Sequence, residues 1–500
     1  AIPQPQPGRA AESTPPPSLD TTLGAVAFSA ASAGESGFIV LDRGWDSLAC
    51  RCALADRAER TLNVQYFAWY ADPPSQLLAD HLLQAAERGV RVRLLLDDLS
   101  LKVGTRELAL LDAHSNIEVR TYNPAAGDYE DKIRRNAQAV REFTLMQRRM
   151  HNKLFLADSS MGLVGGRNVG DKYFDFSGRH NYRDRDVLAV GPVATNLAAA
   201  FDAYWNSAWS VELSRTISYK PKARAVSRHI GDLGPRLARA TADLRLGPDV
   251  SVQSARLTNV WEQAHRGTAE VICDEPGKNP DTGSFTAFGA TGERLTELAL
   301  GVRRELIIQT PYAVLMPGTF DLLRELNRRG VTVRLVTNSK LSSLNPFAVT
   351  SYAEQRKAIL KEKVELFEIR PDGQVFAGLV APRLPGARAV PVSLHAKAGI
   401  FDDDHVYIGS FNLDPRSTHL NTELGLFIDS RSLNREMRRI MDEECQPQNS
   451  WQVVMGDDGE LVWIGTEGGK VTRRSKEPGV SFLKGIMLFL VHLLPVDPLL

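Results

Sequence analysis

Two stretches of the sequence share one pattern: HNKLFLADSSMGLVGGRN at residues 151–168 and HAKAGIFDDDHVYIGSFN at residues 395–412. Each contains His-x-Lys-x4-Asp, followed by a Gly and an Asn at the same offsets. One such motif is expected by chance at roughly the few-per-cent level in a chain of ordinary composition. Two copies with identical spacing are not a coincidence, and they predict a duplicated structural unit.

A strand, helix, strand unit precedes each motif. In the first half the unit comprises RTLNVQYFAWY (60–70), a helical pattern (75–88) and RVRLLLDD after Gly89. In the second half it comprises RRELIIQTPY (303–312), a helical pattern (318–329) and TVRLVTNS after Gly330. The order of elements is the same in both halves.

The two halves are also in register, because Gln65 and Gln309 are 244 residues apart, as are His151 and His395. Each half alternates strands with helices, which predicts an α/β fold. We therefore expect two homologous lobes, each with a mixed, largely buried β-sheet flanked by helices, and an active site at the lobe interface.

Five segments are expected along the chain, because 500 residues exceed one ordinary core. WQVVM, GDDG and ELVWIG (451–465) predict a β-hairpin with no counterpart in the first lobe. The predicted organisation is a Pro-rich N-terminal tether (1–35), lobe 1 (36–215), a connecting segment (216–265), lobe 2 (266–445) and a C-terminal hairpin with an apolar terminal helix (446–500).

The apolar terminal stretch FLKGIMLFLVHLL (482–494) is shorter than the roughly 20 residues that span a bilayer. It predicts either a helix docked on the protein or one lying in a membrane interface. We expect membrane attachment through residues 482–500. The first residue is Ala, as expected of a processed or trimmed N-terminus followed by an exposed tether.

The charge balance argues against a nucleic-acid partner, because 60 Lys and Arg residues match 60 Asp and Glu residues. A local cluster before the first motif predicts either a basic patch or a solvated helix face. It consists of Arg134, Arg135, Arg141, Arg148 and Arg149. The four cysteines lack zinc-ligand spacing and are expected to be mostly buried thiols. They are Cys50, Cys52, Cys273 and Cys445.

The motifs themselves indicate phosphodiester chemistry. Residues two apart on a strand share a face, so His151 with Lys153, and His395 with Lys397, project side by side. Two lobes facing one another then place two imidazoles and two cations around one pocket. The cations neutralise phosphate oxygens, one neutral His attacks phosphorus, and the other, protonated, donates to the leaving oxygen.

These residues resemble the phospholipase D superfamily, whose members carry this duplicated motif. The resemblance implies a covalent phosphohistidine formed without metal or cofactor. It implies His151 as the nucleophile and His395 as the general acid. The phosphate would be held by Lys153, Lys397, Asn168 and Asn412. Asp158 and Asp402 are expected to brace the motifs.

Each catalytic imidazole needs an acceptor for its second nitrogen. Glu423, in NTELGLFI, follows His395 by 28 residues. Asp186, in RDRDVLAV, starts the comparable strand after His151 and is favoured over Asp184, which remains the alternative. The Gly165-Gly166 pair is expected to form a tight turn under the site. Four histidines outside the repeat are expected at the surface or in packing: His265, His405, His419 and His492.

Stretches well beyond the motifs resemble bacterial cardiolipin synthases of the C type. They include ERTLNVQYFAWY, AAERGVRVRLLLDD, RRMHNKLFLAD, GGRNVGDKYF, DVLAVGP, FDAYWNS, SFNLDPRS and LLPVDPLL. The resemblance implies transfer of a phosphatidyl group between phospholipids, phosphatidylglycerol with phosphatidylethanolamine or a second phosphatidylglycerol. Hydrolysis to phosphatidic acid is the alternative, and a phosphodiester nuclease ranks third.

Water exclusion separates transfer from hydrolysis. Six aromatic residues are expected either to line an apolar acceptor site or to pack in the core, and core packing is favoured. They are Phe67, Trp69, Tyr70, Phe174, Phe176 and Tyr312. We expect a peripheral protein on the inner membrane of the bacterial cell envelope. Whether it lies on the periplasmic face, and whether it needs a helper protein, are left open. No 18-residue apolar run occurs in the sequence.

Overall fold

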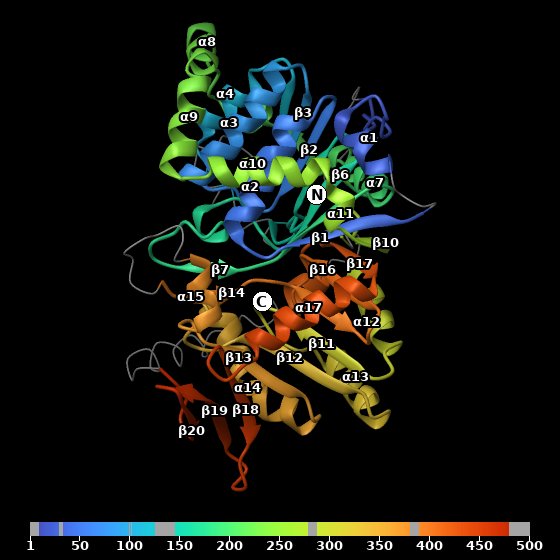
Figure 1. Ribbon diagram of the computed structural model, residues 1–500, viewed down its shortest axis with the longest axis vertical. Coiled ribbons are helices and arrows are strands. Elements are labelled where there is room, and N and C mark those ends of the chain that lie inside the picture. The colour runs from blue at the N-terminus through green and yellow to red at the C-terminus, as the bar shows by residue number, and fades with distance from the viewer. Residues whose placement is uncertain are drawn as a thin grey trace.

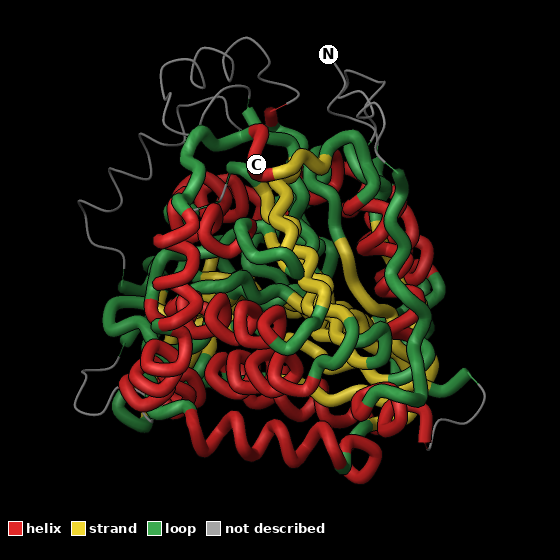
Figure 2. Tube along the Cα trace, turned by 90° about the horizontal axis from the view of Figure 1, so that it is seen from above, coloured by secondary structure: helices red, strands yellow, loops and turns green. Residues whose placement is uncertain are grey.

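The computed structural model describes residues 10–29, 34–99, 101, 103–125, 146–278, 288–380 and 390–479. Two lobes lie one above the other, with the first half of the chain in the upper lobe of Figure 1 and the second half in the lower. Strands occupy the interior, and helices cover the outside (Figure 2).

Lobe 1 is built on a mixed sheet. Its strands are β1 (Ser36–Leu41), β2 (Thr61–Tyr66), β3 (Arg91–Asp97), β4 (Ile117–Tyr122), β5 (Leu154–Ala157), β6 (Met161–Gly165), β8 (Asp186–Val190) and β9 (Ser210–Glu212). They pair in the order β1-β8-β6-β5-β2-β3-β4-β9, with β2–β3 and β3–β4 parallel and the other pairs antiparallel. Its helices are α2 (Gly44–Arg57), α3 (Pro73–Glu87), α4 (Thr105–Asp112), α7 (Val193–Trp205) and two short 3-10 turns, η1 (Asp171–Tyr173) and η2 (Leu213–Arg215).

Lobe 2 repeats this plan. Its strands are β10 (His265–Cys273), β11 (Glu305–Gln309), β12 (Thr332–Asn338), β13 (Glu365–Ile369), β15 (Ala398–Phe401), β16 (His405–Gly409), β17 (Leu424–Asp429) and β18 (Ser450–Met455). They pair in the equivalent order β10-β17-β16-β15-β11-β12-β13-β18. Its helices are α12 (Ala290–Leu300), α13 (Pro317–Arg328), α14 (Pro346–Lys361), α15 (Gln374–Val380), α16 (Pro415–His419) and α17 (Arg431–Glu444). The predicted duplication is confirmed.

The two sheets join at one edge, where β1 pairs antiparallel with β10 and completes an 18-stranded sheet. A second link is the parallel pair β7 (Asn181–Arg183) and β14 (Val392–Leu394), one strand from each lobe. Between the sheets lies one apolar core that includes Leu156 and Val187 of lobe 1 with Ile400 and Leu426 of lobe 2. The lobes therefore share a core as well as a strand pairing.

The C-terminal hairpin is confirmed, but it is not wholly an appendage. β18 and β19 (Leu461–Glu467) form the hairpin, and β20 (Lys470–Arg474) adds a third strand. However, β18 pairs antiparallel with β13 just as β9 pairs with β4. The hairpin therefore begins with the repeat's own edge strand, and within the described residues only β19 and β20 go beyond the plan of lobe 1.

The N-terminal segment is not an exposed tether over residues 10–29. The Thr14 hydroxyl donates to Asp202 at 2.7 Å, and the Ser159 hydroxyl donates to the Pro15 carbonyl at 2.7 Å. Helix α1 (Thr22–Ser29) buries Leu23 and Ala27. This stretch is packed because its polar groups find partners on lobe 1.

The chain between the lobes forms four helices: α8 (Ala223–Gly231), α9 (Leu233–Asp243), α10 (Gly247–Thr258) and α11 (Val260–Gln263). Helix α10 packs on α2, and α9 packs on α3, so this segment covers the outer helices of lobe 1 (Figure 1). In the described part of lobe 2, α12 and α13 occupy the places of α2 and α3 without a comparable helical cover.

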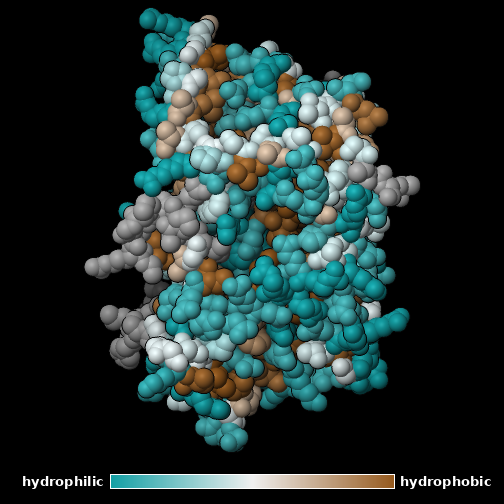
Figure 3. Space-filling model, viewed as in Figure 1, coloured by the Kyte–Doolittle hydropathy of each residue, from teal (hydrophilic) through white to brown (hydrophobic). Residues whose placement is uncertain are grey.

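The apolar terminal stretch 482–494, Arg134, Arg135, Arg141 and His492 lie outside the described residues. Within the described ranges, no helix has both the length and the apolar character needed to cross a membrane. Hydrophilic residues cover most of the face shown in Figure 3, and apolar residues appear there in small groups. The four cysteines are free thiols, and Cys50, Cys52 and Cys445 are buried as expected.

Candidate active site

The two motifs enter one site because the backbone of each lobe pairs with the other just before its histidine. Met150 forms a parallel bridge with Thr422, and the His151 amide donates to the Thr422 carbonyl at 2.9 Å. In the same way, the β7–β14 pair ends at Arg183 and Leu394, and the His395 amide donates to the Arg183 carbonyl at 2.7 Å. Each histidine therefore lies beside the residue that follows Thr422 or Arg183, its backbone hydrogen-bond partner in the other lobe.

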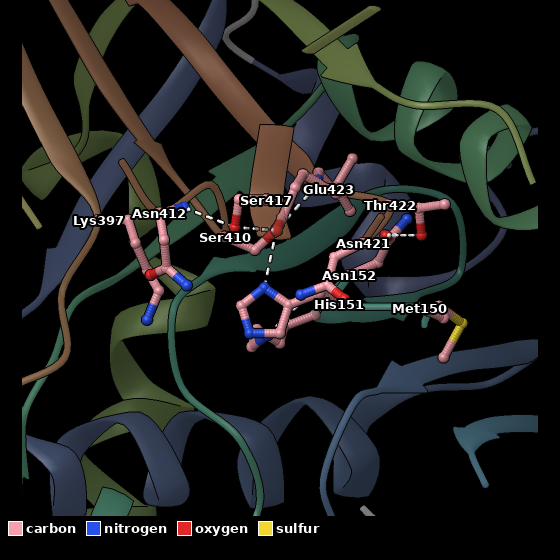
Figure 4. Close-up of polar contacts among 12 residues, drawn as sticks. Met150, His151, Asn152, Lys397, Ser410, Asn412, Ser417, Asn421, Thr422 and Glu423 are labelled. Atoms are coloured by element: carbon pink, nitrogen blue, oxygen red, sulfur yellow. Dashed lines mark hydrogen bonds and ion pairs between the residues drawn. The ribbon is translucent and has the colours of Figure 1, made fainter. Parts of the chain in front are cut away.

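The residue beside His151 is Glu423. Nδ1 of His151 lies 2.8 Å from the Glu423 carboxylate. The same carboxylate accepts hydrogen bonds from Ser417, at 2.7 Å, and from Ser410 (Figure 4). A histidine of lobe 1 is thus oriented by a carboxylate that lobe 2 holds in place.

The residue beside His395 is Asp184. Nδ1 of His395 lies 2.5 Å from one Asp184 oxygen, and the Arg185 amide donates to the other at 2.8 Å. A carboxylate on Nδ1 places the ring proton of a neutral imidazole there and leaves the lone pair on Nε2. Both histidines therefore present Nε2 as the reactive nitrogen.

The expectation that Asp186 orients a histidine is wrong. Its carboxylate accepts from the Ser47 hydroxyl at 2.5 Å and forms a buried ion pair with Arg51 at 3.0 Å. The sheet register gives the reason, because Asp186 pairs with Gly165 as Gly425 pairs with Gly409. The equivalent of Glu423, two residues earlier, is Asp184.

Two buried lysines lie beside the two histidines. Lys153 and Lys397 have exposed fractions of only 1% and 2%. Each ammonium group donates to the carbonyl of its own histidine, in the Lys397–His395 case at 2.6 Å. Among the described residues neither forms an ion pair, so both charges are available to an anion.

Burial lowers the pKa of both lysines. For Lys397 it brings the pKa to about 8, against the opposing effect of Asp184 and Glu423. The pKa of Lys153 is well below its usual value because of burial, and the Lys397 charge lowers it further. An entering phosphate would stabilise both charges and reverse these shifts.

Burial also lowers the pKa of both imidazoles, with the lysines adding to the effect. The pKa of His151 is well below its usual value, and that of His395 is about 3, where Asp184 offsets part of the decrease. Both histidines are therefore neutral near pH 7 until an anion arrives. A bound phosphodiester would raise both pKa values, most effectively for the histidine that already has an ionised partner.

The two asparagines are not equivalent. Oδ1 of Asn168 accepts from the Ala68 amide at 3.1 Å, and its Nδ2 donates to the Tyr173 hydroxyl at 3.1 Å. In contrast, the buried Oδ1 of Asn412 has no hydrogen-bond partner among the described residues. Figure 4 shows Asn412 beside Lys397, facing the space next to the His151 ring. Asn412 is thus the asparagine with unused hydrogen-bonding capacity.

The chain was compared with known proteins. The family model described as "Cardiolipin synthase, PLD-like domain" matches residues 52–205 and 300–445. The chain is 34% identical to cardiolipin synthase C of Escherichia coli K12 over 479 residues, which cover 93% of this chain and 97% of that protein. The chain belongs to the cardiolipin synthase family of phospholipase D-like proteins.

Other similarities agree with this assignment. The major cardiolipin synthase of Bacillus subtilis is 24% identical over 393 residues, covering 78% of this chain and 64% of that protein. Among solved structures, phosphatidylserine synthase of Haemophilus influenzae superposes with a TM-score of 0.53 at 14% identity, covering 82% of this chain and 85% of that one. The latter supports the fold alone.

The motif aspartates of this cardiolipin synthase family member lie away from the imidazoles, beyond the far ends of β5 and β15. Asp158 accepts from the backbone amides of residues 59–61, and Asp402 accepts from those of residues 303–305. Each carboxylate thereby holds the start of the neighbouring strand, β2 or β11. The geometry supports a bracing role for both.

The predicted aromatic residues divide between the site and the core. Phe67 lies edge-on to the His151 ring, with centroids 5.0 Å apart. Trp69 and Phe174 are core residues, as favoured, and Phe176 packs against that core. Tyr70 lies 6.3 Å from Tyr173 between ring centroids.

Sequence reasoning missed two tyrosines beside His395. The rings of Tyr173 and Tyr182 lie 5.2 Å and 5.0 Å from the His395 ring, and 4.8 Å from one another. Both belong to the stretch that precedes Asp184. The only available signal was the density of aromatic residues between the first motif and RDRD.

The Gly165-Gly166 pair is a close packing contact and not a tight turn. Neither glycine has a positive φ. A Cβ on Gly165 would come within 2.3 Å of the Arg185 carbonyl, and one on Gly166 within 2.2 Å of Asp184. The absent side chains let the segment 184–186 approach the motif.

The described part of the basic cluster is neither a patch nor a solvated face. Arg148 and Arg149 are buried, and Arg149 donates to the carbonyls of Tyr122 and Asn123 and lies 3.3 Å from Asp97. The lone histidines within the described residues are in packing or at the surface as expected. His405 stacks on Phe427, and His419 is buried against Phe288.

Proposed function

We propose that this protein is a phosphatidyl transferase of the cardiolipin synthase type. The observation that carries the proposal is the pair of imidazoles, each oriented by a carboxylate of the opposite lobe, around two buried lysines without ion pairs. The lipids are phosphatidylglycerol with phosphatidylethanolamine or with a second phosphatidylglycerol. The relatives' names and the family model support cardiolipin as the product.

In the first step, the donor phosphate lies on Lys153 and Lys397, with the side-chain amide N–H of Asn412 donating to it. Nε2 of His151 attacks phosphorus, and the bond to the head-group oxygen breaks. His395, protonated once the phosphate is bound, gives its Nε2 proton to that oxygen, so glycerol leaves as a neutral alcohol. The lysines stabilise the charge on the phosphoryl oxygens.

In the second step, His395 takes the proton of the acceptor hydroxyl, whose oxygen attacks the phosphohistidine. The phosphorus–nitrogen bond breaks, and His151 is again neutral. Water would follow the same route and yield phosphatidic acid. The aromatic rings of Phe67, Tyr173 and Tyr182 around the histidines favour a lipid alcohol over water at this position.

The two carboxylates support the proposed assignment of roles. Burial acts to raise the pKa of Asp184, but the adjacent His395 and Lys397 outweigh it, and the pKa is lowered. Burial raises the pKa of Glu423 in spite of Lys153. The more strongly ionised partner stabilises an imidazolium better, so His395 is the general acid and His151 the nucleophile.

The lobes and their linker are proposed as functional units: residues 36–215, 216–265 and 266–445. We further propose a peripheral position on the inner membrane of the bacterial cell envelope. Residues 482–500 would provide the contact, because FLKGIMLFLVHLL is apolar and too short to span. Sedimentation with anionic vesicles, with and without these residues, tests this part.

The test of function is to incubate the protein with phosphatidylglycerol, with and without phosphatidylethanolamine, and to identify the lipid products by mass. Cardiolipin with release of glycerol or ethanolamine is the expected result. Phosphatidic acid as the sole product would contradict transfer and indicate a hydrolase. The His151→Ala variant is the control for contaminating activity.

A further inference from the structure

Lobe 2 contains a deep apolar cavity that the catalytic scheme does not use. It lies between α12, α13 and the sheet and encloses about 190 Å³. Its walls are mostly aliphatic and include Leu295, Ala299, Leu306, Leu322, Leu335 and Phe411. An apolar cavity of roughly 150 Å³ holds one benzene molecule, so this one is large enough for a segment of a hydrocarbon chain.

The cavity coincides with a difference between the two lobes. Gly399 and Phe401 in β15 occupy the positions of Phe155 and Ala157 in β5, each 244 residues apart. Phe155 is fully buried in the core between the lobe 1 sheet and its outer helices. In lobe 2 the aromatic residue is Phe401, two residues further from the motif, and Gly399 occupies the position of Phe155.

The glycine also places the cavity next to the phosphate site. Alternate residues of an extended segment share a face, so Lys397, Gly399 and Phe401 lie on one side of the chain. Gly399 and Phe401 line the cavity, as do the two neighbours of Asn412, Phe411 and Leu413. The residues that face a bound phosphate are therefore continuous with the cavity wall.

Part of the cavity lining is exposed to solvent near the N-terminal ends of α12 and α13. Phe288, with 43% of its surface exposed, and the exposed Gly318 are at this edge. Both helices have their N-terminal ends on the side of the sheet where β11 ends and the motif begins. In lobe 1 the equivalent helices are covered by α9 and α10, whereas the described part of lobe 2 leaves this edge open.

We infer that this cavity binds one acyl chain of the donor phospholipid while its phosphate lies on Lys153 and Lys397. The inference rests on the proposed function and adds to it a site for the lipid tail. A hydrocarbon chain fits because its burial among apolar side chains is favourable, while the walls offer few polar partners to other ligands. In this arrangement lobe 2 binds the lipid tail, and His151 of lobe 1 attacks the phosphate.

The kinetic test restores the lobe 1 pattern in lobe 2. The double variant Gly399→Phe/Phe401→Ala fills the end of the cavity near Lys397, and Leu295→Trp fills it from the helix side. Glu297→Trp, an exposed position on the same helix, is the matched control. The measured quantity is kcat/KM for dihexadecanoyl and for dihexanoyl phosphatidylglycerol in detergent micelles.

We expect the preference for the long-chain donor over the short-chain donor to fall at least about tenfold in both filled variants and to stay unchanged in the control. An unchanged preference in the two filled variants, with folding verified by circular dichroism, would overturn the inference. If the wild-type protein forms only phosphatidic acid but the preference still falls, the proposed transfer fails and the tail site stands.

A second measurement does not depend on turnover. Phosphatidylglycerol carrying a diazirine near the end of one acyl chain is photolysed with the wild-type protein, and the labelled peptides are identified by mass spectrometry. Label on α12, α13 or β11 is expected. Label confined to other segments, or no label under conditions where the lipid is consumed, would refute the cavity as the tail site.

Discussion

The two half-sites have the same plan but differ in the carboxylate and in its surroundings. His151 has Glu423, whose pKa burial raises, and two serines bind that carboxylate. His395 has Asp184, whose pKa is lowered once the neighbouring cations overcome burial. Phe67 lies on the first ring, whereas two tyrosines lie on the second.

This difference shows how a duplicated motif can acquire two roles. A neutral imidazole is required for attack, and a proton donor is required for the leaving oxygen. The shorter, more strongly ionised carboxylate favours protonation of its imidazole, and the weaker one leaves its imidazole neutral. Cross-lobe pairing makes each role depend on both lobes, so neither half should be active alone.

The largest expected effects come from the histidines. His151→Ala and His395→Ala should each reduce turnover of phosphatidylglycerol by at least about 10⁴-fold, because each removes a group on the reacting atoms. A donor with p-nitrophenol as leaving group does not need the general acid. A burst of nitrophenol should therefore return in His395→Ala and not in His151→Ala; the reverse pattern would exchange the roles.

The next effect separates the two carboxylates. Asp184→Asn should lower kcat by about a thousandfold, since the amide cannot stabilise the imidazolium and favours the wrong tautomer. The nitrophenol donor should recover most of the first step in this variant. Glu423→Gln should impair both donors alike, because its histidine is the proposed nucleophile. Equal behaviour of the two variants would remove the basis for distinct roles.

Asp186, two residues after Asp184, provides the control for the carboxylate substitutions. Asp186→Asn breaks the buried ion pair with Arg51 and should cost about 3 kcal/mol of unfolding free energy. The protein that remains folded should retain kcat within about threefold, because Asp186 contacts neither histidine. Chemical denaturation and initial rates measure the two quantities. A large loss of kcat with unchanged stability would reinstate Asp186 in the catalytic machinery.

The smallest effect is in the pH profile. The profile of kcat/KM reports groups of the free enzyme. It should decline toward low pH as His151 becomes protonated, at a pH below the ordinary histidine value. Toward high pH it should decline near pH 8, where Lys397 loses its charge. Lys397→Arg should shift the upper decline to higher pH, and a rate that stays constant well above pH 8 in the wild type would contradict this account.

The sequence predicts much of this architecture because duplication leaves a strong internal signal. Identical spacing over 244 residues identifies the lobes, both strand, helix, strand units and the four motif residues at 151, 153, 395 and 397. The N-terminal packing was not predictable, because a Pro-rich segment without apolar periodicity gives no sign of the partners that Thr14 finds on lobe 1.

The identity of the carboxylate at His395 was not predictable for a different reason. Asp184 follows His151 by 33 residues, whereas Glu423 follows His395 by 28, so the register of the repeat is lost between motif and carboxylate. Two acidic residues then stand two positions apart, Asp184 between β7 and β8 and Asp186 as the first residue of β8. Only the β7–β14 pairing, which depends on how the lobes meet, shows which of them reaches the histidine.

The most direct test of the central claim is to locate the covalent intermediate. A donor labelled at phosphorus is mixed with the protein, phosphatidylglycerol for the wild type and the p-nitrophenol donor for His395→Ala. The reaction is quenched within one turnover, and the labelled peptide is sequenced under alkaline conditions that preserve phosphohistidine. The account predicts label on His151 in both proteins. Label on His395 in the wild-type protein, or label that persists in His151→Ala, would contradict it.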